Sequence, residues 1–153
     1  MATIRRATVE DSAAISAIIG EILEEGLAIS FERALEPDEV RTLLERQGGV
    51  GATFVANENG EVVAFGSLDP DPADPSECTF GSWVRRTRRR QGIGTALAEE
   101  ALVFARDLGY RRIRGRLPAG NEPALSYLSS IGALVPLTNP GASFELPLYP
   151  ERS

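Results

Sequence analysis

The sequence predicts a single α/β domain of the α+β type over residues 1–153, with a mixed central sheet of about six to seven strands and about four helices. Three observations support this. Isoleucine and leucine recur at helical spacing over residues 15–23. Two apolar strands flank the turn dipeptide Asn59-Gly60. A strand, a glycine-containing loop, a long helix and another strand follow one another over residues 77–117, which predicts a right-handed crossover between parallel strands.

The N-terminal half is predicted to place two helices between strands. Thr8 and Asp11 have the spacing of a capping box at the start of the first helix, and Pro37 suits the first turn of the second. The predicted elements are a strand at 3–7, a helix from Thr8 to Gly26, a helix from Pro37 to about residue 47, strands at 52–56 and 61–68, and a proline-rich loop at 69–75.

The C-terminal half alternates strands and helices. Gly109 and Gly132 mark helix ends, and Asn121 suits an N-cap. The predicted elements are a strand at 77–84, a helix from Gly92 to about residue 108, a strand at 111–117, a helix from Asn121 to residue 131, and a closing hairpin of 133–135 and 143–146. The complete order is β-α-α-β-β-β-α-β-α-β-β.

The connection between the strand at 77–84 and the helix after it has the chemistry of an anion site. Its loop contains five arginines, and Gly92 and Gly94 open the helix. The first turn of a helix has N–H groups without helical partners and a partly positive dipole end, and glycines let an anion approach them. A phosphate or diphosphate fits such a place. The chain has no lysine, which excludes a P-loop, and no third glycine for a dinucleotide fingerprint.

The motif over residues 89–94, Arg-Arg-Gln-Gly-Ile-Gly, resembles the acyl-CoA signature of the GCN5-related N-acetyltransferase (GNAT) family. The element order is also the family's. The resemblance implies acetyl-CoA as donor and a primary amine as acceptor, attacked directly in a ternary complex. It also implies that the backbone at the end of the strand at 77–84 binds the pantetheine arm of the cofactor. The loop that contains the signature of residues 89–94 would bind its diphosphate. The implied cofactor-binding residues are Ser82, Trp83, Val84, Arg89, Arg90, Gln91, Gly92, Ile93, Gly94, Thr95 and Asn121. The structural alternatives are close helix–strand packing for the glycines, a core aromatic for Trp83 and a plain N-cap for Asn121.

The candidate general acid is Tyr127. The family often shows Asn-x-x-Ala-x-x-x-Tyr-x-x-x-Gly in this helix, where the tyrosine protonates the departing thiolate. Asn121 matches that pattern, but the tyrosine position is Leu128, and Tyr127 stands one residue early. One residue is about 100° around a helix, so a shifted Tyr127, Ser129 or water would serve instead.

The candidate general base is Glu77. Some family members use a glutamate on this strand, at the position occupied here by Cys78, so Glu77 points to the opposite face of the sheet. We expect Glu77 to lie at the surface. Water would then relay the proton of the acceptor amine to Glu24, Glu25 or Glu32. A lone cysteine on a strand is usually part of the core, which disfavours Cys78 as an acyl acceptor.

Composition narrows the remaining function classes. Cys78 is the only cysteine, which favours a cytoplasmic location. The chain has no histidine, which excludes histidine-based catalytic triads and histidine metal sites, so no metal is expected. No apolar run approaches a membrane span, and no membrane partner is expected. Residues 1–84 carry 16 acidic residues against 5 arginines, whereas residues 85–116 carry 10 arginines against 3 acidic residues. This favours an anionic cofactor and a cationic amine over nucleic acid. Two alternative functions stay open: a non-catalytic acyl-CoA sensor, and a GNAT that uses another acyl-CoA. Homodimers are common in the family, so the resemblance also raises a homodimer as an expectation.

Overall fold

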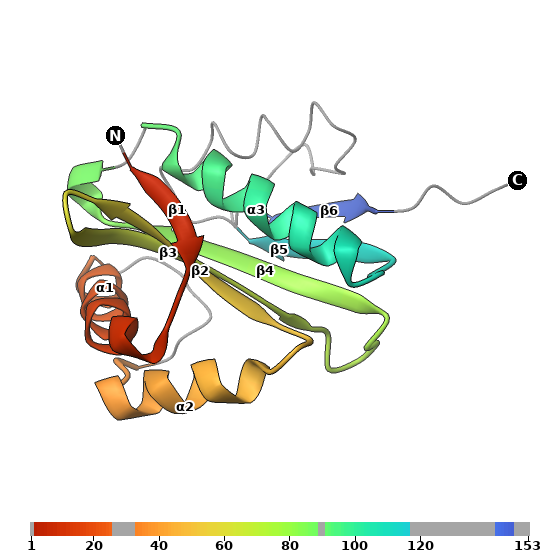
Figure 1. Ribbon diagram of the computed structural model, residues 1–153, viewed down its shortest axis with the longest axis horizontal. Helices are drawn as coiled ribbons and strands as arrows, with labels where there is room; N and C mark the ends of the chain where they lie inside the picture. Colours follow the sequence, from red (N-terminus) through yellow and green to blue (C-terminus); the bar gives the residue numbers. More distant parts are fainter. Residues whose placement is uncertain (1, 26–32, 89–90, 117–142, 149–153) are drawn as a thin grey trace, which may run out of the picture.

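A computed structural model describes residues 2–25, 33–88, 91–116 and 143–148 of the chain (Figure 1). The strands of this part form one six-stranded sheet in the order β1-β2-β3-β4-β5-β6. They are β1 (Thr3–Arg6), β2 (Ala52–Glu58), β3 (Glu61–Pro70), β4 (Glu77–Val84), β5 (Arg112–Arg116) and β6 (Ser143–Pro147). Neighbouring strands are antiparallel except β4 and β5, which are parallel. The predicted mixed sheet and its parallel crossover are therefore confirmed.

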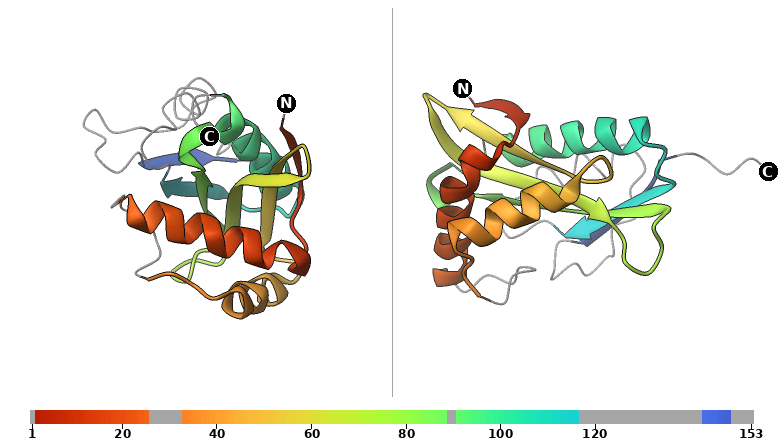
Figure 2. Two further views of the ribbon diagram at one scale, coloured as in Figure 1. Left: turned by 90° about the vertical axis from the view of Figure 1, so that its left-hand side faces the viewer. Right: turned by 60° about the horizontal axis from the view of Figure 1, so that its bottom comes forward.

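Helices cover both faces of the sheet (Figure 2). Helix α1 (Ser12–Glu24) and helix α2 (Pro37–Gln47) lie on one face, and α3 (Ile93–Asp107) lies on the other. The first predicted helix begins with a short 3-10 turn, Val9–Asp11, rather than directly at Thr8. The helix predicted from Asn121 and the strand predicted at 133–135 lie outside the described residues. None of the described helices is long and apolar enough to cross a bilayer.

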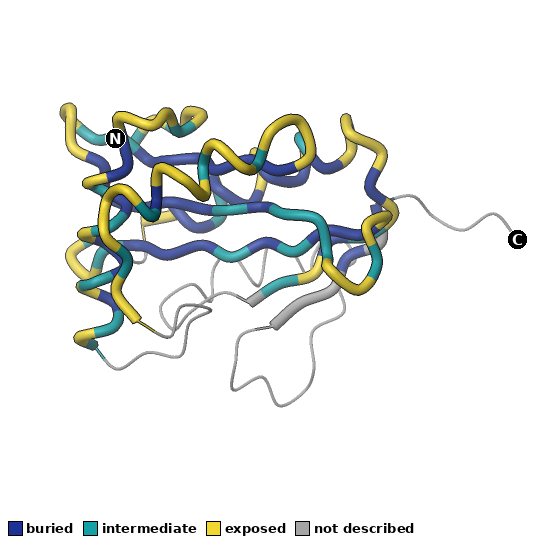
Figure 3. The backbone as a smooth tube through the Cα atoms, turned by 90° about the horizontal axis from the view of Figure 1, so that it is seen from below, coloured by how far each residue is buried: buried dark blue, intermediate teal, exposed yellow. Residues whose placement is uncertain are grey.

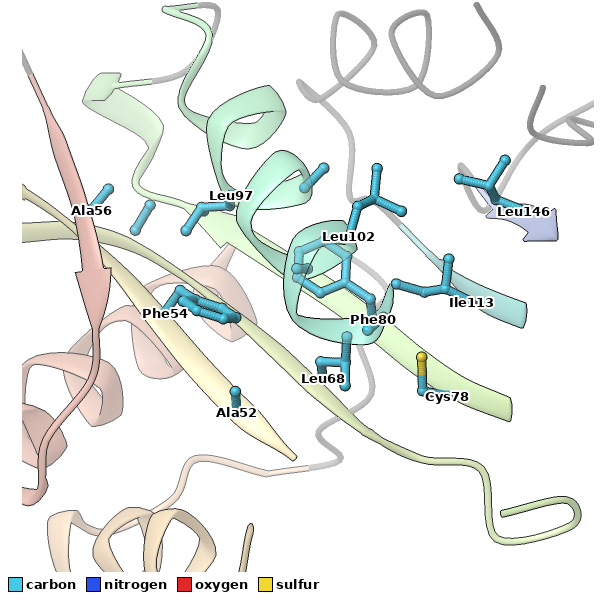
Figure 4. Close-up of a cluster of buried hydrophobic side chains, with 14 of the residues drawn as sticks. Ala52, Phe54, Ala56, Leu68, Cys78, Phe80, Leu97, Leu102, Ile113 and Leu146 are labelled. Carbon is cyan, nitrogen blue, oxygen red and sulfur yellow. The ribbon is translucent and has the colours of Figure 1, made fainter. Parts of the chain in front are cut away.

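Each face of the sheet has its own hydrophobic core. Under α3, the side chains of Phe80, Leu97 and Ile113 are buried together (Figure 4). Under α1 and α2, Ile18 and Phe65 belong to a second cluster. The backbone coloured by exposure shows long buried stretches in the central strands and alternating burial in the helices (Figure 3). This pattern is expected when strands are covered on both faces and helices on one.

Strand β3 is longer than the sequence predicts. The sequence predicts that it ends at Leu68 and that a proline-rich loop follows, but pairing continues through Asp69, opposite Thr79, and Pro70, opposite Cys78. Proline disrupts a ladder because it has no N–H, yet it is tolerated at the end of a strand. Asp69 therefore has a fixed place on the sheet instead of a place in a loop.

An ion pair fastens β1 to the start of the first helical segment. Asp11 accepts the backbone N–H of Thr8 at 2.8 Å, as the predicted capping box requires, and its two carboxylate oxygens accept two N–H groups of Arg5, both at 2.8 Å. Asp11 is buried. The Arg5 hydrogen bonds lower the pKa of the Asp11 carboxyl below its usual value, against the opposing effect of burial.

We expect Asp11→Asn to lower the free energy of unfolding by about 1–2 kcal/mol at neutral pH, because charged hydrogen bonds to a partly exposed arginine are lost. The folded-state pKa of Asp11 is depressed, so its contribution is present above the unfolded-state pKa of about 3.9 and disappears as the pH falls through the folded value. Urea titrations at pH 7 and pH 3 should show the gap between variant and wild type closing. Glu45→Gln, which breaks the exposed Arg41–Glu45 pair, should cost at most about 0.5 kcal/mol. A gap that persists unchanged at pH 3 would contradict this account.

Candidate active site

The described pairing of β4 with β5 ends before residues 82–84, and we call the region beside these residues the opening of the sheet. The described pairing of the two strands runs from Glu77 opposite Arg112 to Gly81 opposite Arg116, which is the last described residue of β5. Strand β4 continues through residues 82–84, which remain paired with β3 on their other side. A strand that extends past the described end of its neighbour can pair through its backbone with an extended, amide-containing ligand.

The side chains at the opening alternate between the two faces. Ser82 and Val84 lie on the α3 face with Phe80, whereas Trp83 belongs to the cluster under α1 and α2. The Ser82 hydroxyl is buried, and among the described residues it has no hydrogen-bond partner. Buried polar groups are normally paired, so an unpaired hydroxyl beside the opening is compatible with a polar ligand there. All three residues predicted to bind pantetheine therefore lie at the opening.

The indole of Trp83 forms part of the wall on the α1–α2 side. It stacks on Phe65 with a centroid distance of 4.8 Å and an interplanar angle of 28°. It also covers Gly81, where a Cβ atom would lie 2.6 Å from the indole ring. Trp83 is therefore a core aromatic, as the structural alternative predicted, and at 5% exposure it still lines a cavity.

The N-terminus of α3 follows the opening directly. Gly92 is its N-cap with φ of 80°, a conformation that favours glycine. The N–H of Ala96 donates to the Gly92 carbonyl at 3.0 Å, so the N–H groups of Ile93, Gly94 and Thr95 precede the first helical hydrogen bond. A Cβ at Gly92 would meet nothing within 4 Å. The helix end is thus accessible to an anion.

The arginine loop is only partly available to such an anion. Arg85 lies 3.1 Å from Glu21 and 3.9 Å from Glu61, and Arg88 donates to Glu58 at 2.9 Å. The guanidinium of Arg88 is therefore engaged by a carboxylate on β2. Arg89 and Arg90 lie outside the described residues, as do Asn121 and Tyr127.

Glu77 is buried, so the expectation that it lies at the surface is wrong. It is 5% exposed and is surrounded by arginines. Arg114 hydrogen-bonds to it, and Arg111 and Arg112 lie 3.7 Å and 4.0 Å away. Sequence spacing could not show this cluster, because it forms only when β5 pairs with β4. Glu77 is four residues before Gly81, which places it about 13 Å from the opening along β4.

Cys78 lies on the opposite face of β4 from Glu77, in the core under α3 (Figure 4). It is fully buried, and burial raises the pKa of its thiol to about 12, with a smaller contribution from the neighbouring Glu77 charge. A thiol in this state has very little thiolate at neutral pH. The structure therefore agrees with a core role for Cys78.

Several polar residues that the sequence analysis did not select line a cavity on the α1–α2 face. They are Gln47, Thr53, Ser67, Asp69 and Thr79. Thr53, Ser67 and Asp69 stand at alternate positions of otherwise apolar strands, so period-two polarity was the signal that could have found them. Within the described residues, no group of three or more His, Cys, Asp or Glu side chains could hold a metal ion.

Comparisons with known proteins agree with this geometry. The model of the acetyltransferase (GNAT) family matches residues 19–133. An N-acetyltransferase from Staphylococcus aureus Mu50 is 28% identical, with 97% of this chain and 99% of that chain covered and a TM-score of 0.80. A putative acetyltransferase from Salmonella typhimurium, solved with its cofactor acetyl-CoA, is 22% identical, with 99% and 96% covered and a TM-score of 0.83. A ribosomal-protein-alanine N-acetyltransferase from Brucella melitensis is 24% identical, with 95% and 99% covered and a TM-score of 0.79. No curated protein matches the chain.

The chain therefore belongs to the GNAT family of acetyltransferases, a class of acyltransferases. The resemblance found in residues 89–94 and the predicted fold class are both confirmed.

Proposed function

We propose that this protein transfers an acetyl group from acetyl-CoA to a primary amine by direct attack in a ternary complex. The observation that carries the proposal is the accessible N-terminus of α3, which directly follows the opening of the sheet at residues 82–84. Two different parts of acetyl-CoA suit these two features. The edge of residues 82–84 would bind the pantetheine amides, and the N–H groups of residues 91–95 would bind the diphosphate. Arg89, Arg90 and Asn121 remain proposed contacts from the resemblance.

The amine would approach from the α1–α2 side, where Gly81 and Trp83 line the cavity. Its nitrogen attacks the thioester carbonyl carbon, the carbon–sulfur bond breaks, and the amine proton leaves through water. We favour a water relay over Glu77 as base, because arginines surround that carboxylate. Tyr127 stays the candidate acid for the departing sulfur.

A single buried cysteine also suits a cytoplasmic location.

The test is calorimetric titration with acetyl-CoA, followed by measurement of CoA release with a panel of primary amines. We expect binding of one acetyl-CoA per chain with a Kd between about 1 µM and 1 mM, and amine-dependent CoA release. Propionyl-CoA and succinyl-CoA serve as competing donors. Absence of acetyl-CoA binding would overturn the proposal. Binding without turnover of any amine would support the alternative of a non-catalytic acyl-CoA sensor. That alternative stays open because Leu128 occupies the family's tyrosine position.

A further inference from the structure

A cavity of about 710 Å³ lies between α1, α2 and the face of the sheet. One end reaches the opening of the sheet, where Gly81, Trp83 and Gly115 line it. Its middle is apolar, because aliphatic side chains from both helices face the Phe65–Trp83 stack. These are Ile15, Ile19, Val40, Leu43 and Leu44. A largely apolar cavity with few polar groups is typical of a small-molecule site.

The other end of the cavity contains a carboxylate. Asp69 is half-buried, and it accepts hydrogen bonds from Gln47 Nε2 at 3.1 Å and from Ser67 Oγ at 3.3 Å. Both donors are neutral. In the described part of the chain, no arginine forms an ion pair with Asp69. Carboxylates withdrawn from water are normally paired with a cation, so this one is suited to a cationic ligand.

The arginines that line the same cavity do not offset this charge. Arg114 reaches the polar end, but its guanidinium is held by Glu77 and lies 3.8 Å from Asp71. Arg46 is exposed on α2 at the rim. An amino-acid acceptor would need a cation for its own carboxylate, and the arginine at this end is already engaged by two acids.

The register of the sheet gives the length of the ligand. Asp69 pairs with Thr79, and Gly81 and Trp83 follow two and four residues later on β4. At a strand rise of about 3.3 Å per residue, the carboxylate lies about 7–13 Å from the opening where the thioester would be presented. Extended diamines from diaminopentane to diaminononane have a nitrogen–nitrogen separation in this range.

We propose that the acceptor is a diamine or polyamine with an apolar backbone, in which one amine is acetylated at the opening and the second, protonated amine pairs with Asp69. This inference rests on the proposed function and deepens it. The two ends of the cavity suit the different protonation states that the two amines of the ligand must have. The reacting amine must be neutral, whereas the anchoring amine stays charged at neutral pH, as an aliphatic amine does.

The test compares diamines with monoamines of equal length. Diaminooctane should have a kcat/KM at least about tenfold above octylamine, because a charge-assisted hydrogen bond is gained. Diaminoethane should have no such advantage, because it cannot span the cavity. Asp69→Asn should lower the ratio of the diaminooctane to the octylamine kcat/KM at least about tenfold, to near one. Asp107→Asn, the same substitution on an exposed site of α3, should leave the advantage intact.

Binding provides a readout that does not depend on turnover. Calorimetry of diaminooctane with the protein saturated by CoA should detect binding that Asp69→Asn weakens at least about tenfold, with thermal unfolding as the check that the variant folds. If acetyl-CoA binds and amines react without any preference for diamines, the inference is wrong and the proposed function stands. A preference that survives in Asp69→Asn, or a preference for amino acids, would also overturn it. Failure to bind acetyl-CoA would instead overturn the proposed function.

Discussion

Gly92→Glu is expected to weaken acetyl-CoA binding at least about a hundredfold in calorimetric titration. The space beside Gly92 is open, so the new side chain can occupy the region in front of the N–H groups of Ile93, Gly94 and Thr95. It would bring a negative charge to the place where the proposed diphosphate binds, and like charges at a binding site cost several kcal/mol. A hundredfold loss corresponds to about 2.8 kcal/mol.

The control for this variant is Gly109→Glu. Gly109 has φ of 82°, against 80° for Gly92, and a Cβ there also meets nothing within 4 Å. Both variants therefore carry the same backbone strain and the same change of charge, but Gly109 lies beyond the opposite end of α3. We expect Gly109→Glu to lower the melting temperature and to bind acetyl-CoA like the wild type. Equal binding losses in the two variants would attribute the effect to strain and remove the evidence for a diphosphate site at Gly92.

The features that sequence could predict depend on local backbone preferences. Asn59 and Gly60 adopt φ of 53° and 83°, as the two-residue hairpin turn requires, and the strands on either side pair as expected. Gly92 opens α3 at the predicted position. The parallel pairing of β4 with β5 followed from the order of elements and the handedness of crossovers. Each of these inferences needs only neighbouring residues or a topological rule.

The features that sequence could not predict depend on contacts between distant residues. Glu77 is buried because Arg111, Arg112 and Arg114 come beside it when β5 joins the sheet. Asp69 belongs to the cavity because β3 continues through two residues that composition assigned to a loop. Periodicity indicates which face a residue occupies, but it does not show which side chains from other strands meet there.

Gly115→Ala is expected to destabilise the protein by about 3 kcal/mol or more, the upper range for overpacking a core. A Cβ at Gly115 would lie 1.8 Å from the backbone oxygen of Phe80, on the neighbouring strand β4. A flexible side chain could rotate away from such a contact, but a carbonyl fixed in the sheet cannot, so β5 must move. For a domain of this size the loss corresponds to a fall in melting temperature of roughly 6–12 °C.

The change should also reach the active site, because Gly115 pairs with Phe80 one step before Gly81, the last residue of β4 in the described pairing with β5. Displacing β5 there alters the width of the opening that receives pantetheine, so acetyl-CoA binding should weaken in the folded fraction as well. Gly20→Ala makes the same substitution in α1, where a Cβ meets nothing within 4 Å. In a helix it should stabilise by about 0.5–1 kcal/mol, so the two variants should shift the melting temperature in opposite directions. Wild-type stability in Gly115→Ala would show that the two strands are not held as closely as this geometry requires.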